Sequence, residues 1–121
     1  MKNEANTQNI VRLTAANLGT VLWRNNVGAG VLDNGSFVRW GLANDTAAVN
    51  ERIKSADLIG IRPVLITQQM VGTIIGQFVS RECKAEGWRY RGTKREIAQK
   101  AWADLIIGYG GDATFTTGEY P

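Results

Sequence analysis

The residues that could do chemistry in this chain converge on one short segment, Glu82-Cys83-Lys84. Successive side chains of an extended strand point to opposite faces, so Glu82 and Lys84 share a face and Cys83 points away from both. A carboxylate beside an ammonium, joined by a second carboxylate such as Asp57 from a neighbouring strand, suits a divalent metal that activates water on a phosphodiester. Glu-x-Lys pairs also occur on many solvated strands as ordinary surface charges. The segment alone therefore does not establish this chemistry, and its interpretation depends on the residues around it.

The absence of histidine narrows the possible chemistry most. Ser-His-Asp and Cys-His hydrolases and Cys2His2 zinc modules need an imidazole, and the chain has no histidine. One cysteine without a histidine also excludes a structural zinc site of ordinary composition. The single cysteine excludes an internal disulfide and is compatible with a reducing compartment. Any bound metal must have oxygen ligands, which points to Mg²⁺, Mn²⁺ or Ca²⁺. Metal-dependent hydrolysis with carboxylates and a lysine remains, or no catalysis at all.

Length and composition indicate one globular domain over residues 1–121. A chain of 121 residues can bury a core, and its net charge of +3 says little about partners. No apolar run is long enough to span a bilayer, and the first residues lack the apolar core of a signal peptide. We expect a cytoplasmic protein without a membrane partner.

The pattern of apolar residues and turn signals predicts an α/β (α+β) fold with a mixed β-sheet flanked by helices. Asp33-Asn34-Gly35 predicts a turn, and the spacing of Thr93 and Glu96 predicts a capping box. Residues 44–53 fit either a short helix or an ordered loop. The expected elements are a helix over 3–18, strands over 20–26, 36–40, 57–61 and 73–84, a helix from Thr93 to about 109–111, and a strand over 113–116.

The segment after Lys84 combines positive charge with aromatic rings. Between residues 81 and 95 there are six basic residues and two acids, with Trp88 and Tyr90 interleaved. Basic side chains neutralise phosphates and aromatic rings stack on exposed bases, so the segment suits nucleic acid. A solvated loop and first helical turn is the competing interpretation. Lys94 and Arg95 would then face an unfavourable helix dipole, which a bound phosphate would offset.

Three other positions have plain structural interpretations when taken alone. Asp57 fits a solvent-facing acid at a strand end, and Gln99 fits a surface glutamine on the second helix. Arg24-Asn25-Asn26, followed by Gly28, lacks the lysine and spacing of a P-loop and fits a polar strand end.

Taken together, these elements resemble the VRR-NUC family (virus-type replication-repair nucleases), a branch of the PD-(D/E)xK nuclease superfamily. The elements that carry the resemblance occur in the family's order over nearly the whole chain. They are Arg24-Asn25-Asn26-x-Gly28, Ser55 to Gly60, Gly76-Gln77-Phe78 leading into Glu82-Cys83-Lys84, Gln99 with Trp102, and Gly110-Gly111.

The resemblance implies a restriction-endonuclease-like fold and a role for each matching residue. Asp57 and Glu82 would be metal ligands for Mg²⁺ or Mn²⁺, with the backbone carbonyl of Cys83 as a third. Lys84 would be the catalytic lysine, and Gln99 the glutamine that supports the site. Family members also place a glutamate on the first helix, where Glu4 is the available acid. The superfamily's Pro-Asp is Ala56-Asp57 in this chain.

The expected function is that of a metal-dependent, structure-selective DNA endonuclease acting on branched, flapped or nicked DNA. Stand-alone family members resemble small viral and bacterial proteins that form homodimers, which implies a phage-type homodimer in a bacterial host cell. A four-way-junction resolvase, a non-catalytic DNA-binding module and a structural protein of a virus remain alternatives. The residues expected to contact DNA are Arg24, Asn25, Arg89, Arg91, Lys94 and Arg95.

Overall fold

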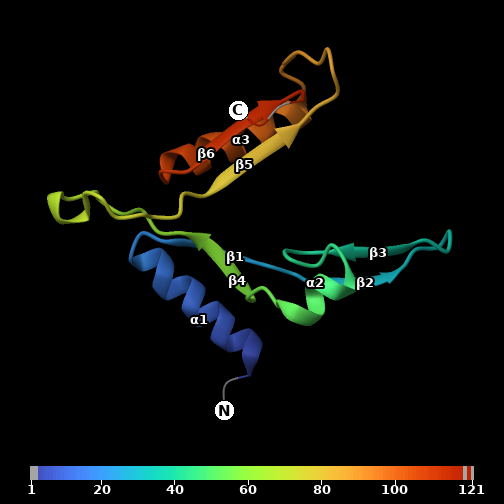
Figure 1. Ribbon diagram of the computed structural model, residues 1–121, viewed down its shortest axis with the longest axis horizontal. Helices are drawn as coiled ribbons and strands as arrows, with labels where there is room; N and C mark the ends of the chain where they lie inside the picture. The colour runs from blue at the N-terminus through green and yellow to red at the C-terminus, as the bar shows by residue number, and fades with distance from the viewer. Residues whose placement is uncertain (1–2, 119, 121) are drawn as a thin grey trace. The chain divides into compact units, whose positions relative to one another are not determined.

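The computed structural model describes residues 3–118 and 120 of the chain. They divide into two compact units, Met1–Gly60 and Ile61–Pro121, and each is described by itself. Helices and short strands occur in both units, from α1 in blue to β6 in red (Figure 1). The mixed α and β composition confirms the predicted class. The single domain over 1–121 stays a prediction.

The first unit opens with α1 (Glu4–Asn17), close to the predicted helix. The Asn3 side chain caps it by accepting a 2.8 Å hydrogen bond from the Asn6 N–H. After the helix, β1 (Val21–Arg24) pairs with β4 (Leu58–Ile61). A Cβ on Gly60 would collide with the backbone of β1, so this pairing requires glycine.

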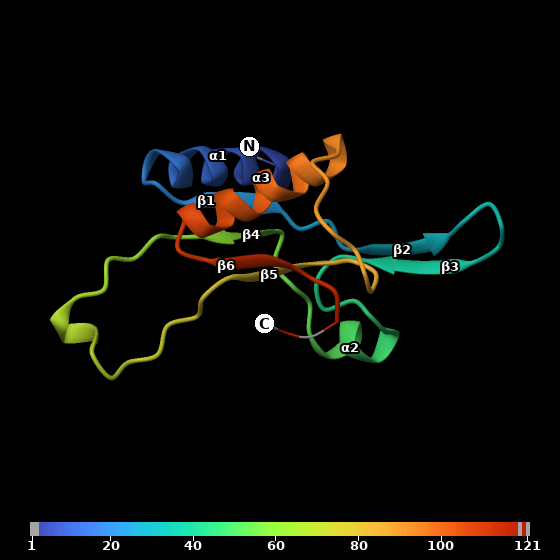
Figure 2. The same cartoon turned by 90° about the horizontal axis from the view of Figure 1, so that it is seen from above.

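A β-hairpin follows β1, and its first strand was not predicted. β2 (Gly28–Val31) pairs antiparallel with β3 (Phe37–Trp40), and the two strands run side by side in Figure 2. The predicted turn at Asp33–Gly35 is confirmed, since Gly35 has φ +85°. The sequence suggested only a glycine-containing segment at 27–30, because Gly28 and Gly30 favour turns. Here Gly28 makes room for the indole of Trp40 on the facing strand.

A short helix, α2 (Ala47–Arg52), settles the choice left open for residues 44–53. The Thr46 side chain caps it by accepting a 3.2 Å hydrogen bond from the Val49 N–H.

The second unit is built on β5 (Val79–Cys83), α3 (Lys94–Gly108) and β6 (Asp112–Thr116). β5 and β6 are parallel, with Val79 opposite Asp112 and Cys83 opposite Thr116, and α3 forms the connection between them. α3 packs on the sheet through Ile106, which is fully buried, and Ala113 of β6 is buried as well. The predicted capping box at Thr93 and Glu96 is confirmed.

The predicted strand over 73–84 is wrong in its first half. Residues 62–78 are irregular apart from a short 3-10 turn, η1 (Gln68–Met70), and the strand starts at Val79. The reason is the partner strand, because Asp112, the first residue of β6, lies opposite Val79. Among the described residues no partner strand runs along 73–78, and the ladder begins where the Phe78 carbonyl accepts a 2.8 Å hydrogen bond from the Asp112 N–H. Gly72 has φ +84°, and Ile74 is 97% exposed.

Strand pairing in the described chain gives three two-stranded sheets, β1–β4, β2–β3 and β5–β6. The predicted larger mixed sheet is therefore replaced by small sheets. The sequence pattern shows which segments are extended, but it does not show how far their hydrogen-bond ladders extend.

Candidate active site

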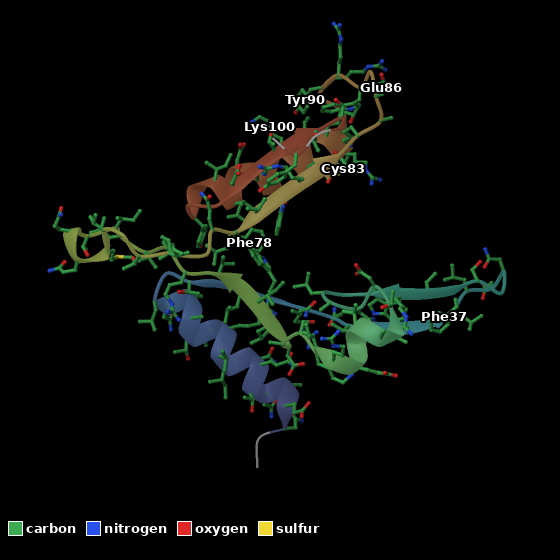
Figure 3. The ribbon with its side chains drawn as sticks, viewed as in Figure 1. Phe37, Phe78, Cys83, Glu86, Tyr90 and Lys100 are labelled. Atoms are coloured by element: carbon green, nitrogen blue, oxygen red, sulfur yellow. The ribbon has the colours of Figure 1, made fainter. Side chains whose placement is uncertain are left out.

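The end of β5 places Glu82 and Lys84 on one face, as the alternation predicts. The Lys84 Nζ lies 3.8 Å from the Glu82 Oε1. Cys83, labelled in Figure 3, is exposed. The parallel pairing with β6 holds this segment in register, because the Lys84 N–H donates to the Thr116 carbonyl at 2.8 Å.

Gln99 closes these two residues into a triangle, which we call the Glu82–Lys84–Gln99 triangle. The Lys84 Nζ donates to the Gln99 Oε1 at 2.7 Å, and the Gln99 Nε2 donates to the Glu82 Oε1 at 2.6 Å. Gln99 is the sixth residue of α3. The capped start of that helix therefore fixes the position of the Gln99 side chain. The amide thus links the ammonium and the carboxylate and orients both.

The lysine of the triangle is much less exposed than the carboxylate. The Lys84 side chain is 16% exposed and the Glu82 side chain 42%. The Lys84 Nζ also lies 5.5 Å from the ring centroid of Trp88 and 5.9 Å from that of Phe115. These two rings stack on each other at 4.9 Å, so the ammonium is attracted to an aromatic surface as well as to Gln99.

A buried carboxylate, Glu96, holds the loop that carries Trp88. It accepts hydrogen bonds from the Thr93 N–H and the Arg91 N–H, both at 3.0 Å, and from the Trp88 indole N–H at 2.8 Å. The Thr93 N–H, followed by the other two donors, lowers the pKa of Glu96 to about 2. Glu96 is therefore ionised at neutral pH and fixes the segment between β5 and α3.

The triangle offers one side-chain oxygen of the kind that a hard divalent cation prefers. Within the described residues the Glu82 Oε1 takes the contacts to Lys84 and Gln99, which leaves the Oε2 for a metal. Alternate residues of a strand direct their backbone groups to the same side, and the Lys84 N–H points to β6. The Cys83 carbonyl therefore points away from β6. No group of three or more Asp, Glu or Cys side chains that could hold a metal occurs among residues 3–118 and 120.

Asp57, Glu4 and Arg24 belong to the first unit, and their side chains are exposed. Asp57 directly precedes β4, and its carbonyl accepts a 2.8 Å hydrogen bond from the Asn25 N–H. Glu4 is the first residue of α1, and Arg24 ends β1. The triangle and these three residues therefore lie in different units.

Asn25 has an internal structural role that the sequence did not indicate. Its Nδ2 donates to the Ser55 Oγ at 2.7 Å and to the Ala56 carbonyl at 2.9 Å, and its Oδ1 accepts from the Leu42 N–H at 3.3 Å. These bonds tie the end of β1 to the segment before Asp57. With these partners, Asn25 positions that segment, and its predicted contact with DNA stays a prediction.

The other residues predicted to contact DNA belong to the second unit, as the triangle does. They lie on the loop after β5, where Figure 3 labels Glu86 and Tyr90, and on the first turn of α3. All are exposed, and within the part of the chain that the structure describes none forms an ion pair. They are Arg89, Arg91, Lys94 and Arg95.

The sequence missed Phe115 and the full role of Glu96. The capping box identified Glu96, but only the fold shows that the same carboxylate also binds the Trp88 indole. Phe115 reaches Trp88 through the pairing of β6 with β5, which a local pattern does not reveal.

No family model, curated protein or solved structure matches the chain. None of the helices within residues 3–118 is both long enough and apolar enough to cross a membrane.

Proposed function

We propose that the chain is a metal-dependent DNA endonuclease of the restriction-endonuclease-like type, selective for branched, flapped or nicked DNA. The Glu82–Lys84–Gln99 triangle is the observation that carries this proposal. It joins an oxygen ligand for a hard cation, an ammonium group and an orienting amide within hydrogen-bond reach of one another.

Each residue of the triangle has a distinct task in phosphodiester hydrolysis. Glu82 holds the cation through its free Oε2, together with the carbonyl of Cys83. A bound Mg²⁺ or Mn²⁺ supplies Lewis-acid polarisation of the phosphate and lowers the pKa of water. Lys84 holds a positive charge where negative charge develops on the phosphate oxygens. Gln99 hydrogen-bonds to both the Lys84 ammonium and the Glu82 carboxylate, which also form an ion pair at 3.8 Å, and so orients the two groups relative to each other.

Binding of the DNA strand is assigned to the basic residues beside the triangle. Arg89, Arg91, Lys94 and Arg95 are exposed without a described ion-pair partner, so they can pair with phosphates. Glu96 fixes the backbone at Arg91 and Thr93, which holds the neighbouring cations in place before DNA arrives.

Asp57 and Glu4 enter the proposal through the family resemblance alone. We assign Asp57 as the second carboxylate of the metal site and Glu4 as a further ligand. Mn²⁺ affinity of Asp57→Asn against that of Asp45→Asn, another exposed acid of the first unit, tests the first assignment. A homodimer is part of the same proposal, and the mass of the protein in solution tests it.

Cleavage of a panel of DNA structures is the test of the proposed function. Purified protein is incubated with branched, flapped, nicked, four-way-junction and linear DNA in Mg²⁺ or Mn²⁺. We expect cleavage of the non-linear substrates that stops in EDTA and is lost in Lys84→Ala. Absence of cleavage of every substrate under both metals would reject the proposal. Cleavage of the four-way junction in symmetric pairs would identify a resolvase, and metal-independent binding without cleavage would identify a DNA-binding module.

A further inference from the structure

The first unit contains a polar cavity of about 360 Å³ that the proposed chemistry does not use. It is formed where the β2–β3 hairpin meets α2 and the residues after it. Its polar wall consists of Arg39, Asn44, Asn50, Lys54 and Ser55, and no carboxylate of the described residues lines it.

A buried asparagine, Asn44, holds Arg39 in this wall through a hydrogen bond. Asn44 is only 3% exposed, and its Nδ2 donates to the Gly28 carbonyl at 2.7 Å and to the Trp40 carbonyl at 2.9 Å. Its Oδ1 is thereby turned to Arg39, whose Nη1 donates to it at 3.2 Å. A guanidinium has five N–H donors, so most of those on Arg39 remain for another acceptor.

Lys54 supplies a second positive charge to the same cavity. Its Nζ donates to the Asn50 carbonyl at 3.0 Å and to the Asn50 Oδ1 at 2.7 Å, which leaves one N–H. The Asn50 Nδ2 also has no acceptor among the described residues. The unused polar groups of Arg39, Asn50 and Lys54 are thus all donors.

Nothing described in the structure balances these two charges. Neither Arg39 nor Lys54 forms an ion pair within residues 3–118 and 120. Asp45 and Glu51 are close in sequence, but both are exposed and neither lines the cavity. Two cations that share one cavity repel each other, and an anion between them would remove that cost.

We propose that this cavity binds a phosphate group. The arginine fork matches two oxygens of a phosphate, while the lysine and the Asn50 amide can donate to the others. The volume is large enough for a phosphate with an attached sugar. The group belongs to a DNA strand or to a free nucleotide, and in the DNA case the inference rests on the proposed function.

Binding measured in EDTA, without cleavage, tests the cavity. Fluorescence anisotropy with hydroxyl-ended DNA compares wild type, the double variant Arg39→Gln/Lys54→Gln, and Arg52→Gln. Arg52 is an exposed cation of α2 that does not line the cavity, so it controls for the loss of charge. We expect the double variant to bind about tenfold more weakly and the slope of log affinity against log salt to fall by about 2. Arg52→Gln should change affinity by less than about twofold.

A second experiment distinguishes binding of a DNA strand from binding of a free nucleotide. Inorganic phosphate and adenosine monophosphate are titrated while the backbone amide resonances of Gly28 and Asn44 are followed by NMR. Saturable shifts in wild type that vanish in the double variant, with DNA affinity unchanged, assign the cavity to a free nucleotide or phosphate. If neither DNA affinity nor these titrations differ between wild type and the double variant, the inference is overturned. An equal loss of DNA affinity in Arg52→Gln overturns the DNA assignment.

The single variant Lys54→Gln covers the case in which the double variant fails to fold. It retains the Arg39–Asn44 contact, and it should show about half the change in the slope of log affinity against log salt. A protein that binds phosphate as expected but cleaves no DNA would reject the proposed function and leave the cavity assignment in place.

Discussion

The Glu82–Lys84–Gln99 triangle and the polar cavity of the first unit use positive charge in opposite ways. In the triangle, the ammonium of Lys84 lies 3.8 Å from a carboxylate and is joined to it through an amide. In the cavity, the cations Arg39 and Lys54 donate to amide and carbonyl oxygens, and the Arg39 guanidinium also lies 5.2 Å from the Phe37 ring centroid. The first arrangement is neutral as a whole, and the second carries a net positive charge.

This difference indicates what each region can receive. A neutral group of acid, amide and lysine can bind a cation on its carboxylate while its ammonium faces a substrate phosphate. A cavity of uncompensated cations repels a metal ion and attracts an anion. The comparison therefore predicts that metal binding and salt-dependent anion binding respond to different substitutions.

The largest effect is expected from Glu82→Gln in a Mn²⁺ titration. Gln keeps the shape of the side chain but removes the charge of the proposed ligand. Loss of groups that merely support a ligand typically costs 10–100-fold in metal affinity, so we expect a loss of at least about 100-fold for the ligand itself. Calorimetry without DNA measures it, and Glu86→Gln, an exposed glutamate of the next loop, is the control. Equal Mn²⁺ affinity in both variants would exclude Glu82 as a ligand.

Gln99→Met should have a smaller effect on the same site. Methionine fills similar space but loses the hydrogen bonds to Lys84 and Glu82. We expect Mn²⁺ affinity and the cleavage rate each to fall about tenfold, the lower end for a supporting residue. Gln69→Met, in the exposed η1 turn, should match wild type. An unchanged pH–rate profile and rate in Gln99→Met would show that the amide does not position the triangle.

In the first unit, Asn25→Ala should lower the free energy of unfolding by about 1 kcal/mol. The substitution removes the hydrogen bonds to Ser55, Ala56 and Leu42, whose partner groups remain partly accessible to water. Urea unfolding measures the change. Asn26→Ala, at an exposed position next to it, should cost less than about 0.5 kcal/mol. Similar losses in both variants would remove the structural role of Asn25.

A pH-dependent effect on stability is expected at Glu96. The folded state lowers the pKa of Glu96 to about 2 from an ordinary value of 4.5. A carboxyl whose folded pKa is depressed stabilises the fold fully above its ordinary pKa and loses that contribution as pH falls toward the folded value. The difference in unfolding free energy between wild type and Glu96→Gln should therefore be largest near neutral pH and shrink between about pH 4.5 and 2. A constant difference for Glu96→Gln over this range would contradict the assignment.

Local patterns in the sequence predicted the elements whose causes are local. The capping box at Thr93, the turn at Gly35 and the shared face of Glu82 and Lys84 each depend on a few adjacent residues, and each is confirmed. The family resemblance alone placed Gln99 at the site, because its position on the helix taken alone fits a surface glutamine.

The features that the sequence did not predict depend on partners far along the chain. The segment before Val79 has no partner strand among the described residues because β6 begins at Asp112, and in the β2–β3 pair Gly28 leaves room for the Trp40 ring. The cavity likewise requires Asn44 to accept from Arg39 while it donates to the backbone of two strands. Such pairings depend on how distant segments meet, which residue spacing does not encode.

The most direct test of the central claim is the rate of cleavage of one flapped DNA at saturating concentration in Mn²⁺. Wild type, Lys84→Met and Arg52→Gln are compared in a single turnover. The account predicts a fall of at least about 100-fold for Lys84→Met, because a preorganised charge at the phosphate is lost, and a wild-type rate for Arg52→Gln. Cleavage by Lys84→Met at the wild-type rate, or no cleavage by wild type, would contradict it.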